Sequence, residues 1–426
     1  MLNKKKYLAI QGGEKIIKYK SPHWKWPLNS KEKFSSIIKY YKNEENLFEK
    51  EGYPSVVKRF EINFAKYQKK KYALALNSGT STLLAAFFAI GIRPGDEVIA
   101  PSLTFHATAT PIIALGAIPI LADCTMDTGN ICTEDIKKKI NKKTKAIIVT
   151  HLCGHPCEMD ELVEVCKKKN LFLIEDCSHA HGATYKNKKV GTFSDIACFS
   201  LDRNKLISAG EGGVLVTNNK DFFEKALIYS DYGPRVQNQI KTDYLRKFID
   251  TGLGHKHRIH PVAAVIANSE LKKICYYIKK RKQVLDYFSK KISSIPGLKP
   301  PITKKYVTRG AYFGYRPFFN TKELKNISIK NFIKILQAEG MEVRQAGNPP
   351  LHLCKIFSKH KVPLLNRNEL SYKNYKKSDL PNSEKFYNST ISIPTFTFEK
   401  KKLINLYIKT FRKVCFYLNK HKVKIS

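Results

Sequence analysis

Acidic residues are scarce in this 426-residue chain. Aspartate and glutamate number 36 against 76 lysines and arginines, so the formal net charge is +40 at neutral pH. Such a charge is typical of proteins that bind nucleic acid or a membrane surface. The lysines, however, lie in short runs along the whole chain, at residues 4–6, 69–71, 137–139, 167–169 and 400–402. Because they form no single basic arm, we expect solvated basic faces, no nucleic acid as the main partner, and a preference for anionic substrates.

Long hydrophobic runs are lacking as well. The longest mostly apolar stretch, residues 107–122, contains Pro111, Gly116 and Pro119. It is too short and too broken to span a membrane. The first residues carry lysines with no apolar segment after them, so we expect no signal peptide. Ten cysteines in such a chain suit a reduced compartment, and we expect a cytoplasmic protein.

A complete metal-binding pattern is also missing. Cys153 and Cys157 flank a Gly-His-Pro sequence, which looks like half of a zinc site. No second pair of cysteines or histidines follows at zinc-finger spacing. The sequence therefore predicts no bound metal.

What the sequence does contain, from residue 72 onward, is an alternation of short apolar runs with amphipathic stretches. The candidate strands are residues 72–76, 97–100, 118–121, 146–150, 171–175, 197–200 and 213–217. Strands separated by helical stretches predict an α/β fold with a mostly parallel sheet flanked by helices. A long candidate helix follows at residues 261–287. We predict a large domain within residues 1–260, and a linking helix with a smaller α+β domain in residues 261–426.

A tight turn follows the first candidate strand. The sequence Asn-Ser-Gly-Thr-Ser, residues 77–81, leads directly into an apolar helical stretch. Free N–H groups and the dipole at the start of a helix favour a phosphate. Gly79 lets the backbone approach closely, and Thr80 and Ser81 add hydroxyl donors. An ordinary N-capped helix is the alternative interpretation.

A carboxylate ends another candidate strand. Asp176 follows an apolar run, at the edge of an α/β sheet where ligands bind. An aspartate in this place would keep the nitrogen of a pyridine ring protonated. His179, three residues later, would hydrogen-bond a ring hydroxyl. The alternatives are a helix N-cap for Asp176 and a structural histidine with satisfied hydrogen bonds for His179.

Lys205 is distinguished from the many other lysines by its neighbours. It lies between Ser200 and a glycine-rich segment, residues 210–213. A lysine in a sequestered pocket loses its proton easily and forms a Schiff base with an aldehyde. A solvated surface lysine is the alternative.

Taken in order, these motifs resemble the sugar aminotransferases of the DegT/StrS type, which depend on pyridoxal 5'-phosphate (PLP) and have the aspartate-aminotransferase fold. The resemblance covers nearly the whole chain. Further motifs that carry it lie at residues 60–65, 94–99, 104–108, 254–258, 349–352 and 393–394.

The resemblance assigns a role to each candidate residue. Lys205 would hold PLP as a Schiff base and act as the catalytic base, and Asp176 would pair with the pyridine nitrogen. Phe105 would stack on the ring, and His179 occupies a position that is glutamine in many members and histidine in others. The residues that would hold the phosphate are Gly79, Thr80, Ser81 and Ser200.

Lys256 occupies a position that is asparagine in many members of the family, where it reaches the phosphate of the neighbouring subunit's cofactor. A lysine would serve that phosphate as a point charge. The resemblance then implies a homodimer in which each active site is built from two subunits.

The implied reaction moves an amino group from L-glutamate or L-glutamine to a keto-sugar, nucleotide-linked in the preferred case, or to a keto-cyclitol. Residues 176–183 resemble the branch that includes the keto-cyclitol aminotransferases. Two alternatives stay open. Relatives that dehydrate sugars with the same cofactor replace the lysine by histidine, which Lys205 opposes. A basic, non-catalytic binding or regulatory protein is favoured by the net charge alone.

Overall fold

A seven-stranded sheet forms the centre of the larger domain. The computed structural model describes residues 7–18, 26–42, 55–310, 312–345, 347–358 and 374–423. The strands of the sheet are β1 (Tyr72–Leu76), β2 (Glu97–Pro101), β3 (Ile118–Ala122), β4 (Thr144–Thr150), β5 (Phe172–Asp176), β8 (Ile196–Ser200) and β9 (Gly213–Thr217), in the order β1-β9-β8-β5-β4-β2-β3. Strand β9 is antiparallel to both of its neighbours, and the other adjacent pairs are parallel. The prediction of a mostly parallel sheet is confirmed.

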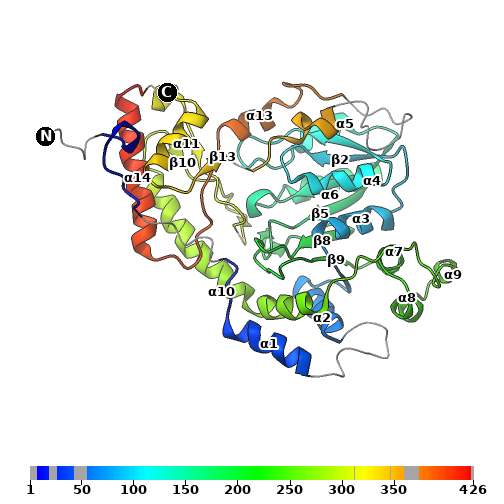
Figure 1. The fold of residues 1–426 in the computed structure, drawn as a ribbon. Coiled ribbons are helices and arrows are strands. Elements are labelled where there is room, and N and C mark those ends of the chain that lie inside the picture. The colour runs from blue at the N-terminus through cyan, green and yellow to red at the C-terminus, as the bar shows by residue number, and fades with distance from the viewer. Residues whose placement is uncertain are drawn as a thin grey trace.

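Helices cover both faces of this sheet (Figure 1). One face packs against α3 (Gly79–Ala89), α4 (Thr110–Ala114), α7 (Lys220–Ser230), α8 (Pro234–Gln239) and α9 (Asp243–Arg246). The other packs against α2 (Ser55–Gln68), α5 (Thr133–Lys139), α6 (Met159–Lys169) and the start of α10 (Pro261–Ile292). Along β1, Leu74 joins the first core and Ala75 the second. Because both faces are buried, these strands read as continuous apolar runs in the sequence.

The smaller domain has a hydrophobic core of its own. Helix α10 passes from the large domain into this core, where it packs against α11 (Ile329–Ala338) and α14 (Lys401–Lys420). Leu8 and Ile17 also belong to this core, and the Ile17 N–H donates to the Glu339 carbonyl at 2.9 Å. The mixed α/β class is confirmed. The division between residues 260 and 261 remains a proposal, and the N-terminal residues 8–17 pack across it.

The remaining α-helices and strands lie outside the seven-stranded sheet. The helices are α1 (Lys31–Lys42), α12 (Lys355–Ser358) and α13 (Pro381–Asn388), and the two-residue strands are β6 (Thr184–Tyr185), β7 (Lys188–Lys189), β10 (Leu298–Lys299), β11 (Val307–Thr308), β12 (Phe318–Phe319), β13 (Arg344–Gln345) and β14 (Ile391–Ser392). Within the described ranges, no helix is long and apolar enough to cross a membrane.

Candidate active site

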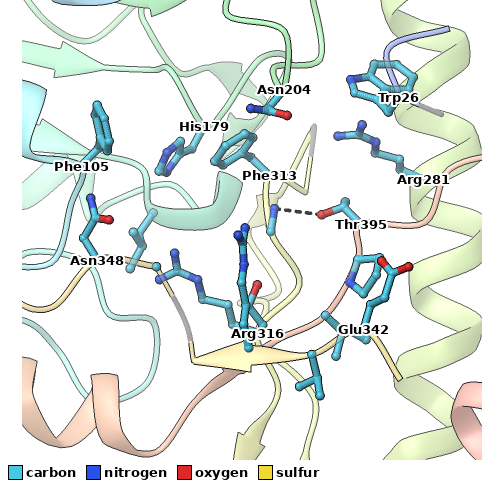
Figure 2. A pocket seen from close by; sticks show the side chains of 18 of the residues that line it. Trp26, Phe105, His179, Asn204, Arg281, Phe313, Arg316, Glu342, Asn348 and Thr395 are labelled. Atoms are coloured by element: carbon cyan, nitrogen blue, oxygen red, sulfur yellow. Dashed lines mark hydrogen bonds between the residues drawn. The ribbon is translucent and has the colours of Figure 1, made fainter. Parts of the chain in front are cut away.

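A cavity of about 1030 Å³ lies between the large and the small domain. The large domain lines it with residues that follow the carboxyl ends of the parallel strands, among them Phe105 after β2, Leu152 after β4, His179 after β5 and Asn204 after β8. Ligands of α/β folds bind at this edge of the sheet. The small domain contributes segments around residues 313–316, 341–348 and 392–395 (Figure 2).

Asp176 ends β5, three residues before the cavity-lining His179, and its carboxylate is held from two sides. One oxygen, Oδ2, accepts a hydrogen bond from the Thr108 hydroxyl at 2.7 Å, and Oδ1 accepts one from the Ser178 N–H at 3.1 Å. The segment that follows is a series of turns, so the N-cap interpretation of Asp176 is wrong. The side chain is almost completely buried, at 4% exposure.

Lys205 and His179 meet around one aromatic ring of the small domain. The ammonium nitrogen of Lys205 lies 4.0 Å from the centre of the Phe313 ring, and the same ring stacks on His179 at 4.2 Å. Burial lowers the pKa of Lys205, while Asp176 and Asp202 act in the opposite direction. Lys205 is therefore not the solvated surface lysine of the alternative interpretation, because its amine is partly desolvated and gives up its proton more easily.

His179 is buried and remains uncharged. Burial moves its pKa well below the usual value, and the charges of Lys205 and Arg316 act in the same direction. Its Nδ1 atom is buried without a hydrogen-bond partner among the described residues. His179 thus keeps one ring nitrogen for which a ligand would be the partner, and its contact with a ring hydroxyl stays a prediction.

The turn between β1 and α3 forms a narrow cradle beside β8. A Cβ atom on Gly79 would lie 2.7 Å from the Cβ atom of Ser200, so only glycine fits here. Ser78 caps α3 by accepting the Ser81 N–H at 3.0 Å, and the Ser81 hydroxyl donates to Asn77 at 2.7 Å. The helix is thus N-capped, as the alternative interpretation had it. The cradle also brings Gly79, Ser81 and Ser200 together, while Thr80 is exposed.

Two other candidate residues are exposed. Phe105 lines the cavity with 52% of its surface open. Lys256 is also exposed, in a loop between α9 and α10. The backbone carbonyl of the next residue, His257, accepts the Asn77 N–H at 2.7 Å. The loop of Lys256 therefore lies beside the cradle of its own chain, and the predicted contact with a second subunit's phosphate stays a prediction.

Trp26 fastens the N-terminal segment to the loop that carries Lys205. Its indole N–H donates to the Lys205 carbonyl at 3.1 Å. The guanidinium of Arg281 on α10 lies 4.5 Å from the indole ring, and Tyr277 meets the ring edge-on at 5.1 Å. The N-terminal segment and α10 thereby hold the lysine loop in place.

A group of three possible metal ligands lies behind the site. His151, Glu175 and Cys177 are buried, and their ligand atoms lie within 4.8 Å of one another. Both oxygens of Glu175 already accept the Gly191 N–H, at 2.7 and 2.8 Å. Burial raises the pKa of Glu175 to about 7, which weakens it as an anionic ligand near neutral pH. Cys153, which the sequence had offered as half of a zinc site, is not part of this group.

Several residues of the site were not singled out from the sequence. Thr108 lies within the motif at residues 104–108, but no pattern in the neighbouring sequence shows that its hydroxyl contacts Asp176. Phe313, Arg316 and Trp26 come from segments far from the strand ends, so no sequence spacing connects them with Lys205. The one signal in the sequence for these residues was the pair of threonines at 104 and 108, whose hydroxyls lie 2.7 Å apart in the structure.

Known proteins that are similar to this chain in sequence and those that are similar in structure include aminotransferases. Residues 46–404 match the sequence model of the DegT/DnrJ/EryC1/StrS aminotransferase family. A GDP-perosamine synthase of Escherichia coli O157:H7 is 39% identical over 239 residues, which span 56% of this chain and 64% of that protein. An L-glutamine:2-deoxy-scyllo-inosose aminotransferase of Streptomyces kanamyceticus is 29% identical over 301 residues, or 70% of each chain.

Among solved structures, an aminotransferase from Psychrobacter cryohalolentis superposes with a TM-score of 0.80 and 25% identity. The superposition covers 94% of this chain and all of that one. The shared fold therefore covers both domains.

Proposed function

The chain belongs to the DegT/DnrJ/EryC1/StrS aminotransferase family, and from this premise we propose that it moves an amino group from L-glutamate or L-glutamine to a keto-sugar or a keto-cyclitol. Enzymes of this family depend on PLP. The observation that carries the proposal is that the Lys205 amine lies 4.0 Å from the ring centre of Phe313, a cavity-lining residue that also stacks on His179, three residues after the buried Asp176 carboxylate.

The residues around the cavity fit PLP. Gly79 approaches Ser200 so closely that any side chain would clash, and this brings Ser200 beside the first N–H groups of α3, where a phosphate binds favourably. The open face of Phe105 suits a flat ring, and the unpartnered Nδ1 of His179 suits a ring hydroxyl. We therefore propose that Gly79, Thr80, Ser81 and Ser200 hold the phosphate while Phe105 and His179 contact the ring.

Lys205 acts twice in the proposed reaction. When bound, PLP supplies an aldehyde for the lysine and an electron-withdrawing ring. Because burial lowers the pKa of Lys205, its amine is available as a nucleophile at a lower pH than an ordinary lysine. With PLP and the donor bound, the unprotonated Lys205 amine would serve as the base that takes a proton from the donor carbon and returns it.

Asp176 holds a proton on the ring nitrogen in this proposal. Thr108 and the Ser178 N–H fix both carboxylate oxygens, so the orientation of the carboxylate does not depend on the ligand. His179 stays neutral beside it, so it presents no second positive charge to the ring.

The names of the relatives support both classes of acceptor. One relative is a GDP-perosamine synthase, and another is an L-glutamine:2-deoxy-scyllo-inosose aminotransferase. The basic surface of the chain favours a phosphate-bearing acceptor, so we propose a nucleotide-linked keto-sugar first and a keto-cyclitol second.

The test is the visible absorbance spectrum of the purified protein with PLP, before and after L-glutamate or L-glutamine. We expect a band from the lysine-bound cofactor that disappears as the donor amine is taken up, and no such band in Lys205→Ala. A wild-type protein without the band would overturn the proposal and favour a basic binding protein. A positive result is followed by turnover assays with a nucleotide-linked keto-sugar and with a scyllo-inosose.

A further inference from the structure

The lining of the cavity is strongly positive. The lining residues include the arginines Arg203, Arg281, Arg316 and Arg344 and a single acidic residue, Glu342. Arg203 and Arg344 are exposed, and Arg281 is engaged with Thr397 and Trp26. Arg316 differs from these three, because it is half-buried and no described residue gives it a hydrogen bond or an ion pair.

The position of Arg316 is set by its surroundings. Its neighbours in the chain are fixed, since the Tyr315 carbonyl accepts the Ile393 N–H at 3.2 Å and the Pro317 carbonyl accepts the Ile391 N–H at 3.2 Å. The guanidinium lies against Gly347, where an added Cβ atom would come within 2.6 Å of Nη2. Gly347 has a φ of +66°, which glycine adopts at no cost. A glycine thus leaves room for this side chain beside the cavity.

Arg316 also borders the proposed reaction centre. It follows Phe313 by three residues, and Phe313 touches both Lys205 and His179. Figure 2 shows Arg316 among the residues that line the cavity together with Phe313 and His179. Its charge also helps to keep His179 uncharged.

We propose that Arg316 binds an oxyanion group of a substrate, either the carboxylate of the amino donor or a phosphate of the acceptor. A planar guanidinium with no protein partner offers its paired N–H groups to two oxygens of such a group. This inference rests on the proposed function, because an amino acid and a phosphate-bearing acceptor are the substrates it names.

The test measures binding of two unreactive anions to the PLP-loaded protein by calorimetry, at 0.15 M salt so that exposed lysines are screened. Glutarate represents the donor and GDP the acceptor. The variants are Arg316→Gln, Arg316→Lys and, as a control, Arg93→Gln. Arg93 is exposed and precedes β2, at the opposite edge of the sheet.

We expect Arg316→Gln to weaken the binding of one or both anions at least tenfold, in line with the loss of a charged hydrogen bond. Arg316→Lys should weaken their binding less, because lysine keeps the positive charge but lacks the paired N–H groups of the guanidinium. Loss of glutarate alone identifies the donor carboxylate, and loss of GDP alone identifies the acceptor phosphate. Unchanged binding of both anions in Arg316→Gln, or equal weakening in Arg93→Gln, would overturn the inference.

The two proposals fail separately in this design. The absorbance test of the proposed function measures Lys205 and the cofactor, whereas glutarate and GDP undergo no reaction. Thermal unfolding of each variant at the same pH shows whether the fold is kept. If Arg316→Gln does not fold, Arg316→Lys carries the test alone.

Discussion

Thr108 shows how single hydroxyls prepare this site. Its Oγ1 donates to Asp176 at 2.7 Å and lies 2.7 Å from the Thr104 hydroxyl and 3.3 Å from the Thr150 hydroxyl. The carboxylate that we propose to hold the ring proton is therefore oriented by a cluster of three threonines from two segments of the chain. A charge-assisted hydrogen bond of this kind contributes about 1.5–3 kcal/mol.

Replacing Thr108 by valine should slow the half-reaction with L-glutamate by roughly 10- to 100-fold, because it removes this bond with little change of volume. Stopped-flow absorbance gives the rate, and a titration gives the affinity for PLP. Thr184→Val serves as the control, since the Thr184 hydroxyl bonds Thr308 at an exposed site. A Thr108→Val rate equal to that of the wild type would show that Asp176 needs no such support.

A buried histidine makes the stability depend on pH. Burial lowers the pKa of His155 to about 4, against about 6.5 in an unfolded chain. Between these values the unfolded chain binds a proton that the folded chain does not, so the free energy of unfolding falls as the pH falls from about 6.5 toward 4. His151 and His181, with pKa values of about 3, act in the same direction, while the raised pKa of Glu175 opposes them.

The variant His155→Asn should therefore lose less stability than the wild type on going from pH 7 to pH 5. The difference should be about 2 kcal/mol, the value for one such histidine. Urea unfolding of both proteins at the two pH values measures it. Parallel losses in the two proteins would mean that His155 is protonated in the fold.

At the scale of elements, a buried ion pair joins two helices to the sheet. Arg235 on α8 donates through Nη2 to both oxygens of Glu61 on α2, each at 2.9 Å, and Glu61 also accepts the Ala75 N–H of β1 at 2.8 Å. Burial raises the pKa of Glu61 even with Arg235 beside it. The geometry of α2, α8 and β1 thus depends on one carboxylate.

Arg235→Ala should lower the free energy of unfolding by about 3–5 kcal/mol, because it leaves a buried carboxylate without its partner. The control is Lys168→Ala, which removes an exposed pair with Glu164 and should cost about 1 kcal/mol or less. Denaturant titration of both variants provides the comparison. Equal losses in the two would contradict the buried pair's role.

The elements that the sequence predicted are those with a local signal. All seven strands of the sheet were predicted to within about two residues, because burial on both faces makes each of them a continuous apolar run. Helix α10 begins at the predicted Pro261 and runs five residues further, to Ile292 rather than residue 287. The two-residue strands of the smaller domain, such as β13, are too short to show any periodicity.

For the whole molecule, the outstanding proposal is a dimer with shared sites. We expect Lys205→Ala and Lys256→Ala each to be inactive, for different reasons. Mixed dimers of the two variants would contain one intact site, with Lys205 from one subunit and Lys256 from the other. Half of randomly mixed dimers are of this kind, so activity should recover to about one quarter of the wild-type value.

Activity of the separate variants and of a co-refolded mixture measures this recovery, with molar mass from light scattering as the control for dimer formation. A mixture that stays inactive would place each site within one chain.

The candidate site itself was predictable only in its strand-end residues, such as Asp176 and Lys205. The residues that complete it, Phe313, Arg316 and Trp26, come together only through the packing of the two domains.

The bond between Trp26 and the Lys205 carbonyl has an optical consequence. Indole emission overlaps the absorption of a pyridoxal bound to lysine, so excitation energy passes from Trp26 to a cofactor held there. The chain has two tryptophans in all, Trp24 and Trp26. With Trp24 replaced by phenylalanine, the protein would carry a single tryptophan, beside its own reactive lysine. The filling and emptying of the site could then be followed in real time, without a label and without a substrate.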